Sequence, residues 1–289
     1  MANNLHDQHR LKKGLTIFDK KNRDEVLVNP LFIAAKKGDS QAAVQLVESL
    51  WNEDKSQELR QLILPEKSPI FFSVPSTSRL NQVPIAYARF LAQQTQDLGG
   101  TFLVGDEYIA PLHTSMMKSV KNGNRLMSPR LYEPYNEMFF ERLREHAQFS
   151  QIILVEDILT TGSSVNTFRR FLQHNDIPVD CIVGIKGDTD LSPTQKEIDK
   201  LEKQARKVGV VDIGVNWQKL GRELTKNEIS ALSFQYLGSR YQKASDKTQL
   251  LMRRQLYYLY ALRACLRYET AHKVEKLNHL IERRERIHD

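Results

Sequence analysis

Residues 152–165 read Ile-Ile-Leu-Val-Glu-Asp-Ile-Leu-Thr-Thr-Gly-Ser-Ser-Val, and this stretch decides the fold. An apolar run typical of a buried strand ends in two adjacent carboxylates, Glu156 and Asp157. A loop rich in hydroxyl groups follows, and residues 165–172 then carry apolar side chains at helical spacing. A strand, a short loop and a helix in this order predict a parallel α/β sheet, which binds its ligands at the carboxyl ends of its strands.

The loop offers the groups that a phosphate needs. Backbone N–H groups at a helix N-terminus favour an anion, and Gly162 lets the backbone approach it closely. The two carboxylates can accept strong hydrogen bonds from a diol. The stretch therefore predicts a site for a phosphorylated sugar, with the phosphate at the loop residues Thr160, Thr161, Gly162, Ser163 and Ser164.

An ordinary joint between a strand and a helix is the simpler alternative. In that interpretation Thr161 or Ser163 only caps the helix, and the two carboxylates are solvated loop charges. A cap needs one hydroxyl, however, whereas the loop carries four, and a cap does not explain an acidic pair at the end of an apolar strand. The pattern favours the binding site.

The same residues resemble the phosphoribosyl pyrophosphate (PRPP) motif of type I phosphoribosyltransferases. That motif is a hydrophobic strand, two acids and two variable residues, followed by Thr-Gly and small hydroxyl residues. The resemblance implies a twisted parallel sheet flanked by helices. It also implies transfer of the 5-phosphoribosyl group from PRPP to a nitrogen acceptor, with release of pyrophosphate. Glu156 and Asp157 would be the catalytic carboxylates, holding the ribose hydroxyls directly or through Mg²⁺, and the loop 160–164 would bind the 5′-phosphate.

A second loop is the candidate for the pyrophosphate. The apolar run at 70–74 stops at a proline, and a hydroxyl-rich loop with Arg79 follows; an arginine can bind an anion through two parallel hydrogen bonds. A simple turn capped by Ser78 or Asn81 is the alternative. Because type I enzymes place their pyrophosphate loop after the first core strand, the resemblance assigns this role to Pro75, Ser76, Thr77, Ser78 and Arg79.

The residues around this loop are similar to the competence-associated branch of the family. The shared features are Val74-Pro75, Asn81-Gln82 and the following helical stretch, although Leu80 stands where that branch has Phe. Further on, residues 105–135 lack clear periodicity, and a loop of that length in a compact domain is usually functional. The resemblance implies a flexible loop there that supplies cations to the leaving pyrophosphate, with Lys118, Lys121 and Arg125 as candidates. Exposed loop cations without a role are the alternative.

The acceptor is less well defined. Family members that act on 6-oxopurines carry Asp where this chain has Thr160, so the resemblance argues against hypoxanthine or guanine. Orotate is not favoured either, because orotate enzymes usually lack a long basic helical tail. Two functions remain: a catalytic transferase, or a non-catalytic protein that senses PRPP or a nucleotide, or associates with nucleic acid, in competence or defence.

Charge and composition limit the surroundings in which the protein works. A net charge of +7 fits a multiply anionic substrate and fits nucleic acid equally well. Two cysteines without pairing spacing, a polar N-terminus and no apolar run of membrane-spanning length predict a cytoplasmic protein without a membrane contact.

Three segments are expected along the chain. Residues 1–64 form a polar arm over 1–29 and then helices; residues 65–236 form the α/β domain; residues 237–289 form a basic amphipathic helix or helical pair. The last segment holds eleven Lys or Arg against six Asp or Glu over 243–289. A solvated helix face is favoured there, and a contact with nucleic acid or protein is the alternative; a homodimer is a further hypothesis. The expected helices span 30–37, 39–50, 84–92 and 136–146, and the expected strands 70–74, 101–104, 152–155, 181–185 and 208–215.

Overall fold

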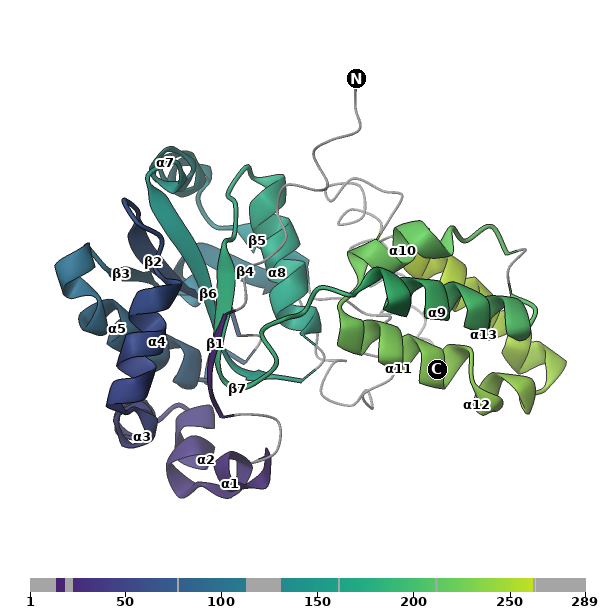
Figure 1. Ribbon diagram of the computed structural model, residues 1–289, viewed down its shortest axis with the longest axis horizontal. Helices are drawn as coiled ribbons and strands as arrows, with labels where there is room; N and C mark the ends of the chain where they lie inside the picture. The colour runs from purple at the N-terminus through teal and green to yellow at the C-terminus, as the bar shows by residue number, and fades with distance from the viewer. Residues whose placement is uncertain are drawn as a thin grey trace, which may run out of the picture. The chain divides into compact units, whose positions relative to one another are not determined.

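The apolar run at 152–155 lies in the centre of a five-stranded sheet in which all neighbouring strands are parallel (Figure 1). The computed structural model describes residues 14–18, 23–76, 78–112, 131–160, 162–210, 213–261 and 263. The strand order is β1-β7-β6-β2-β3. These strands span Leu15–Phe18 (β1), Cys181–Gly187 (β7), Ser150–Leu159 (β6), Ser68–Ser73 (β2) and Thr101–Leu103 (β3).

Helices cover both faces of the sheet, so the side chains of the central strands are buried on both sides. Nearly every residue of these strands is therefore apolar. Residues 150–155 of β6 are all buried, and so are residues 181–186 of β7. The predicted α/β class, with a parallel sheet flanked by helices, is confirmed.

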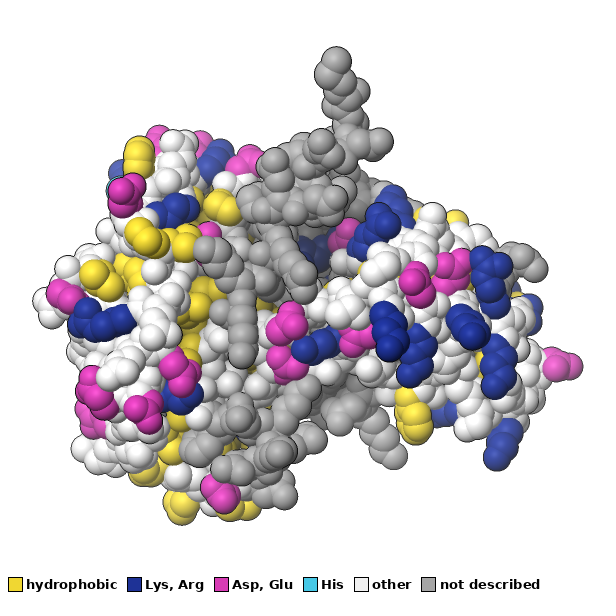
Figure 2. Space-filling model, viewed as in Figure 1, with side chains coloured by type: hydrophobic (Ala, Val, Ile, Leu, Met, Phe, Trp, Pro, Cys, Tyr) yellow, Lys and Arg dark blue, Asp and Glu magenta, His cyan; other side chains and the backbone are white. Residues whose placement is uncertain are grey.

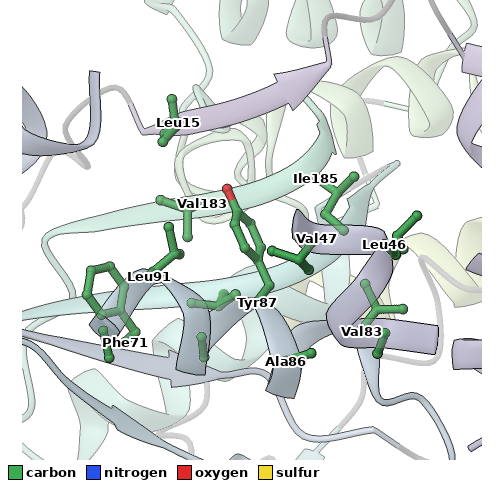
Figure 3. Packing of buried hydrophobic residues seen from close by; sticks show 14 of the residues in the cluster. Leu15, Leu46, Val47, Phe71, Val83, Ala86, Tyr87, Leu91, Val183 and Ile185 are labelled. Atoms are coloured by element: carbon green, nitrogen blue, oxygen red, sulfur yellow. The ribbon is translucent and has the colours of Figure 1, made fainter. Parts of the chain in front are cut away.

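One face of the sheet packs against helices that come before and after β2 in the chain. They are α2 (Pro30–Lys36), α3 (Ser40–Leu50), α4 (Glu53–Leu62) and α5 (Val83–Gln94). Their apolar sides meet Phe71 and Val183 of the strands in one buried cluster (Figure 3). Ile153 of β6 belongs to the same cluster. The helices predicted at 30–37, 39–50 and 84–92 are confirmed, whereas α4, with its polar sequence, was not predicted.

The other face is covered by α7 (Glu137–Ala147) and α8 (Ser163–His174) and is rich in aromatic side chains. Phe72 of β2 meets Phe168 of α8 edge-on, with ring centroids 5.3 Å apart. Tyr132 lies 4.9 Å from the same Phe168 ring. Tyr132 belongs to β5 (Leu131–Pro134), which pairs antiparallel with β4 (Ile109–Leu112). This hairpin flanks residues 113–130, and the helix predicted at 136–146 is confirmed as α7. The remaining short elements of this part are α1 (Arg23–Val28), the 3-10 turn η2 (Gln96–Leu98) and α6 (Gly105–Tyr108).

The expectation of a polar arm over residues 1–29 is wrong for its second half. Leu15 and Thr16 of β1 pair with Val183 and Gly184 of β7, so this segment forms the edge of the sheet. Gly14 precedes the strand, and a Cβ there would lie 1.6 Å from the Ile182 carbonyl oxygen, so only glycine fits. A four-residue strand carries too little periodicity to be recognised, since its partner is distant in sequence.

The chain divides into two compact units, Met1–Ser115 with Arg130–Leu191, and Met116–Pro129 with Ser192–Asp289. The sheet lies in the first. The helices described in the second are α9 (Gln195–Lys207), α10 (Trp217–Glu223), α11 (Lys226–Tyr236), α12 (Ser239–Gln242) and α13 (Asp246–Tyr260). They share a core that includes Leu201, Leu220, Leu232 and Leu256. The helices before residue 64 thus share the core of the sheet, and those on both sides of residue 236 share the second core.

The strand predicted at 208–215 is wrong for the residues that are described there. Val208, Val210 and Val215 gave the segment a strand-like pattern. However, Gly209 and Gly214 adopt the left-handed backbone conformation, with φ of 72° and 77°, which interrupts an extended chain. The predicted helical pair after residue 237 is confirmed as far as Tyr260, with Ser245 capping α13. In the described ranges no helix combines the length and apolar character that a membrane span needs.

Replacing Tyr87 with Phe tests the packing of the first core. Tyr87 is fully buried among the apolar side chains of that cluster (Figure 3), and burial raises the pKa of its hydroxyl. No described residue forms a hydrogen bond with this hydroxyl. We expect Tyr87→Phe to keep the free energy of unfolding or raise it by about 1 kcal/mol, because an unsatisfied buried hydroxyl is costly.

Urea unfolding provides the measurement, with Tyr87→Ala as the comparison. That variant removes the ring as well and is expected to lose about 3–5 kcal/mol. A loss of more than 1 kcal/mol in Tyr87→Phe would show that the hydroxyl has a partner and would contradict this account of the core.

Candidate functional site

The acidic pair and the loop after β2 lie at the same edge of the sheet. Strands β2 and β6 are parallel neighbours, and Ser73, the last residue of β2, lies opposite Val155. Strand β6 continues to Leu159 beside β7, so Glu156 and Asp157 lie in β6 just beyond the end of β2. The backbone N–H of Val74 donates to the Val155 carbonyl at 2.9 Å and holds the start of the loop next to Glu156. The edge at which parallel strands end is where such sheets bind ligands.

Asp157 is the most constrained residue of this edge. Its side chain is only 4% exposed. Asn81 Nδ2 donates to Asp157 Oδ2 at 2.8 Å, Lys36 Nζ forms an ion pair with the same oxygen, and the Ile158 N–H donates to Oδ1 at 2.6 Å. A buried carboxylate needs such partners to remain charged.

The pKa of Asp157 reflects opposing effects. Burial alone would raise it, but the positive charge of Lys36 and the hydrogen bonds with Glu156, Lys36 and Asn81 together hold the pKa below its ordinary value. Asp157 is therefore ionised at neutral pH. Glu156 is half-buried, and its Oε1 accepts from the Asp157 N–H at 3.1 Å.

Lys36 and Asn81 both reach Asp157 because a backbone hydrogen bond joins the end of α2 to the segment before α5. Helix α2 begins at Pro30 with Asn29 as its cap, and its last turn carries Lys36. The Gln82 N–H donates to the Ala35 carbonyl at 3.1 Å, which fixes the residues before α5 against the end of α2. Asn81 Oδ1 in turn accepts from the Val83 N–H at 3.3 Å, so this side chain both positions α5 and contacts the carboxylate.

The loop after β6 leads directly into the N-terminus of α8. Gly162 is the residue that caps this helix, with φ of 72° and ψ of 4°, so neither Thr161 nor Ser163 is the cap residue. A Cβ on Gly162 would lie 2.7 Å from Leu191 Cδ2. The position therefore requires glycine for its backbone conformation and for its space. A twelve-residue helix that begins without a side-chain cap presents its N-terminal dipole to an anion.

Of the other predicted phosphate residues, Thr160 is exposed and Ser163 and Ser164 are half-buried. Tyr132 of the hairpin donates its hydroxyl to the Ser164 carbonyl at 3.3 Å and so supports the start of α8. Thr161 lies outside the described residues.

The loop after β2 is held by groups that the sequence did not indicate. The Ser76 N–H donates to Asp106 Oδ1 at 2.8 Å, and the hydroxyls of Ser76 and Ser78 are 3.1 Å apart. Asp106 comes from α6, which follows β3. In the loop expected to bind pyrophosphate, the Ser76 N–H thus already donates to a carboxylate of the protein. A loop that is ready to bind pyrophosphate would leave this N–H available to the anion.

Arg79 lies in this loop in a conformation that is rare for a residue with a side chain, with φ of 54°. Its guanidinium is hydrogen-bonded to the Tyr135 hydroxyl and lies 5.8 Å from the centre of the Tyr135 ring. Pro75, at the start of the same loop, is buried, whereas Arg79 is exposed. Arg79 therefore remains accessible to an anion, with Tyr135 directing its side chain.

Several predicted residues cannot be placed. Thr77 and the flexible-loop candidates Lys118, Lys121 and Arg125 lie outside the described residues. The structure brings together Glu156, Asp157, the 160–164 loop and the 74–79 loop, and it adds Lys36, Asn81, Asp106 and Tyr135. Asn81 belonged to the motif that marked the resemblance, whereas no local pattern distinguishes Lys36, Asp106 or Tyr135.

No protein-family model, no curated protein and no solved structure matches this chain.

Replacing Lys36 with Met tests the role of the buried ion pair. In the wild type the ionised Asp157 stabilises the fold above its unfolded pKa, and this contribution is lost as the pH falls through the lower folded value. Without Lys36 the effect of burial dominates, so the pKa rises above the unfolded value and the ionised carboxylate destabilises the fold at neutral pH. We expect a loss of about 1–3 kcal/mol at pH 7, less than for a fully buried pair because the Lys36 side chain is 39% exposed.

The loss should shrink as the pH falls towards 4, since protonation then removes the uncompensated charge in the variant. Urea unfolding across this pH range measures it, with Lys37→Met as the matched control at the exposed end of the same helix. Equal losses in the two variants, or a loss in Lys36→Met that does not change with pH, would contradict the account.

Proposed function

We propose that this protein is a Mg²⁺-dependent phosphoribosyltransferase that moves the 5-phosphoribosyl group of PRPP to a nitrogen acceptor and releases pyrophosphate. One observation carries the proposal: a pair of carboxylates near the carboxyl end of β6 is followed, shortly after the strand ends at Leu159, by a helix N-terminus that begins at a glycine. This arrangement offers acceptors for a diol and donors for a phosphate a few residues apart, as a phosphorylated ribose requires.

In this proposal the donor is held by groups of known chemistry. Glu156, which is half-buried, and the ionised Asp157 accept hydrogen bonds from the ribose 2- and 3-hydroxyls. The loop Thr160, Thr161, Gly162, Ser163 and Ser164 binds the 5′-phosphate at the N-terminus of α8. Asn81 and the Ile158 N–H hold the Asp157 carboxylate in place, and the ribose replaces the contact that Lys36 makes with it.

The pyrophosphate lies towards the loop after β2. Arg79 is its exposed cation, and Pro75, Ser76, Thr77 and Ser78 form the loop around it. Because the Ser76 N–H donates to Asp106, the Asp106 carboxylate must release this N–H or accept a hydrogen bond from a protonated pyrophosphate oxygen. Lys118, Lys121 and Arg125 are the proposed cations that close over the leaving group.

The donor set of this edge suits Mg²⁺ that takes most of its ligands from the substrate. In the described residues no group of three or more His, Cys, Asp or Glu side chains is placed to enclose a metal. Two adjacent carboxylates, Glu156 and Asp157, are nevertheless what Mg²⁺ uses when phosphate oxygens complete its shell. When bound, the ion would neutralise charge on the pyrophosphate.

The reaction follows from this placement. The acceptor nitrogen forms a bond to C1 of the ribose while the bond between C1 and the pyrophosphate oxygen breaks, and its electron pair leaves with the pyrophosphate. The acceptor nitrogen then loses its proton to the released pyrophosphate or to water. The residues of the site act by orienting C1 and by stabilising positive charge on the ribose with Glu156 and Asp157, rather than by forming a covalent intermediate.

A protein that binds PRPP or a nucleotide without catalysis, in competence or defence, is the second candidate. Two contacts favour it: Lys36 pairs with Asp157, and Asp106 accepts from the Ser76 N–H. The Asp157 carboxylate and the Ser76 N–H thus both have partners in the protein itself. This fits a site in which a bound ligand replaces these partners. For the first candidate, the presence of Thr160 argues against 6-oxopurines as acceptors.

A pyrophosphate-release assay distinguishes the two candidates. Full-length protein is incubated with PRPP, Mg²⁺ and one acceptor at a time from a panel of nucleobases and nucleotides. We expect release that requires all three components and falls about 10²-fold or more in Asp157→Asn, because the carboxylate stabilises the charged transition state. Asp97→Asn is the matched control, since Asp97 is exposed and pairs with Arg60 at the surface.

PRPP binding without release for any acceptor would exclude the transferase and favour the second candidate. If PRPP does not bind at all, the transferase fails, and the second candidate also fails if no nucleotide of the panel binds.

A further inference from the structure

Helix α9 carries a row of four exposed lysines in the second unit. Lys196, Lys200, Lys203 and Lys207 are all exposed. Their spacing of four, three and four residues places them on one side of the helix, because an α-helix turns once in 3.6 residues. At 1.5 Å per residue the row is about 16 Å long. We refer to these four residues as the α9 lysine row.

Packing of α9 directs this row outward. Ile198, Leu201 and Ala205 are buried in the core of the second unit, and they lie on the opposite side of the helix. No other apolar side chain occurs in α9. The helix therefore cannot rotate to cover the lysines without exposing its whole apolar side.

The carboxylates of α9 are engaged elsewhere. Glu197 forms a capping box with Thr194. Asp199 accepts from Gln195 and Gln218 at 2.8 and 3.0 Å, and Glu202 accepts from Gln218 at 2.7 Å and from Arg206 at 2.6 Å. The bonds from Gln218 and its neighbours lower the pKa of Asp199 and Glu202 and keep them charged on the flank of α9 that faces α10.

The lysine row is therefore not neutralised. None of its four members forms an ion pair with a carboxylate of the described residues. Figure 2 shows Lys and Arg side chains gathered over the helices of this unit. The row lies before residue 237 and so is distinct from the basic C-terminal segment.

The chemistry of the row identifies the partner. Evenly spaced cations match a chain of phosphates, and 16 Å corresponds to about five base-pair steps of a duplex at 3.4 Å each. The exposed side of α9 has no aromatic residue on which an unpaired base could stack, and no apolar residue that could enter a membrane. We propose that the α9 lysine row binds the phosphate backbone of double-stranded nucleic acid without reading its sequence.

Salt-dependent binding of a labelled duplex tests the proposal. Fluorescence anisotropy follows the full-length protein with a 20-base-pair DNA over a series of salt concentrations. We expect the slope of log K against log salt to fall in magnitude by about 1.8 in Lys200→Gln/Lys203→Gln, since each phosphate contact contributes about 0.9. Lys196→Gln/Lys207→Gln, at the two ends of the row, should show the same change.

The matched control removes the same charge from the first unit. Lys67 and Arg142 have no described ion-pair partner there, and Lys67→Gln/Arg142→Gln should leave the slope unchanged. An equal change in the control would mean that net charge alone attracts the duplex, which overturns the proposal. So would the absence of duplex binding at low salt. An effect of the row variants on binding to phosphatidylserine vesicles, with duplex binding unaffected, would replace nucleic acid by a membrane surface.

Discussion

The candidate site depends on keeping one buried carboxylate charged. Asp157 is almost completely removed from water, and besides the neighbouring Ile158 N–H it is Lys36 and Asn81 that compensate for the loss of its hydration. These two residues come from the end of α2 and the segment before α5, so the requirement fixes both helices against the carboxyl end of β6. The N-terminal helices are therefore part of the site as well as of the core.

The same edge of the sheet combines groups that suit opposite charges. The N-terminus of α8, with Gly162 as its cap, favours an anion, while the acidic pair favours hydroxyl donors or a cation. In the protein alone, Lys36 forms an ion pair with Asp157 and the Ser76 N–H donates to Asp106, so both of these groups already have a partner within the protein. A ligand such as PRPP, which carries both a diol and phosphates, can exchange both contacts at once. A simple phosphate can exchange only one.

Local patterns allowed the centre of the fold to be predicted from the sequence. Strand β6, its acidic pair and the glycine at the start of α8 follow one another closely in the chain, and their order predicts a strand, a loop and a helix whichever role the loop has. Lys36 could not be predicted, because its role depends on the hydrogen bond between Gln82 and Ala35, which joins segments far apart in the chain. Strand β1 was missed because its pairing with β7 spans most of the first unit.

The wrong strand at 208–215 has a different cause. Its valines follow a strand-like pattern, but Gly209 and Gly214 adopt left-handed backbone conformations, which an alternating pattern of apolar residues does not reveal. Residues that lie outside the described ranges, among them Lys118, Lys121 and Arg125, stay predictions. The acceptor also stays undefined, because the residues that would contact it are not marked by any pattern in the chain.

The most direct test of the central claim is calorimetric titration of the full-length protein with PRPP and Mg²⁺, comparing Gly162→Ala with Gly209→Ala. Both glycines have φ of 72°, but a Cβ on Gly162 would overlap Leu191, whereas a Cβ on Gly209 meets nothing within 4 Å. The account predicts saturable binding of one PRPP by the wild type and by Gly209→Ala, and binding weakened about a hundredfold or more in a folded Gly162→Ala, equivalent to about 2.7 kcal/mol. No binding by the wild type, or equal binding by both variants, would contradict it.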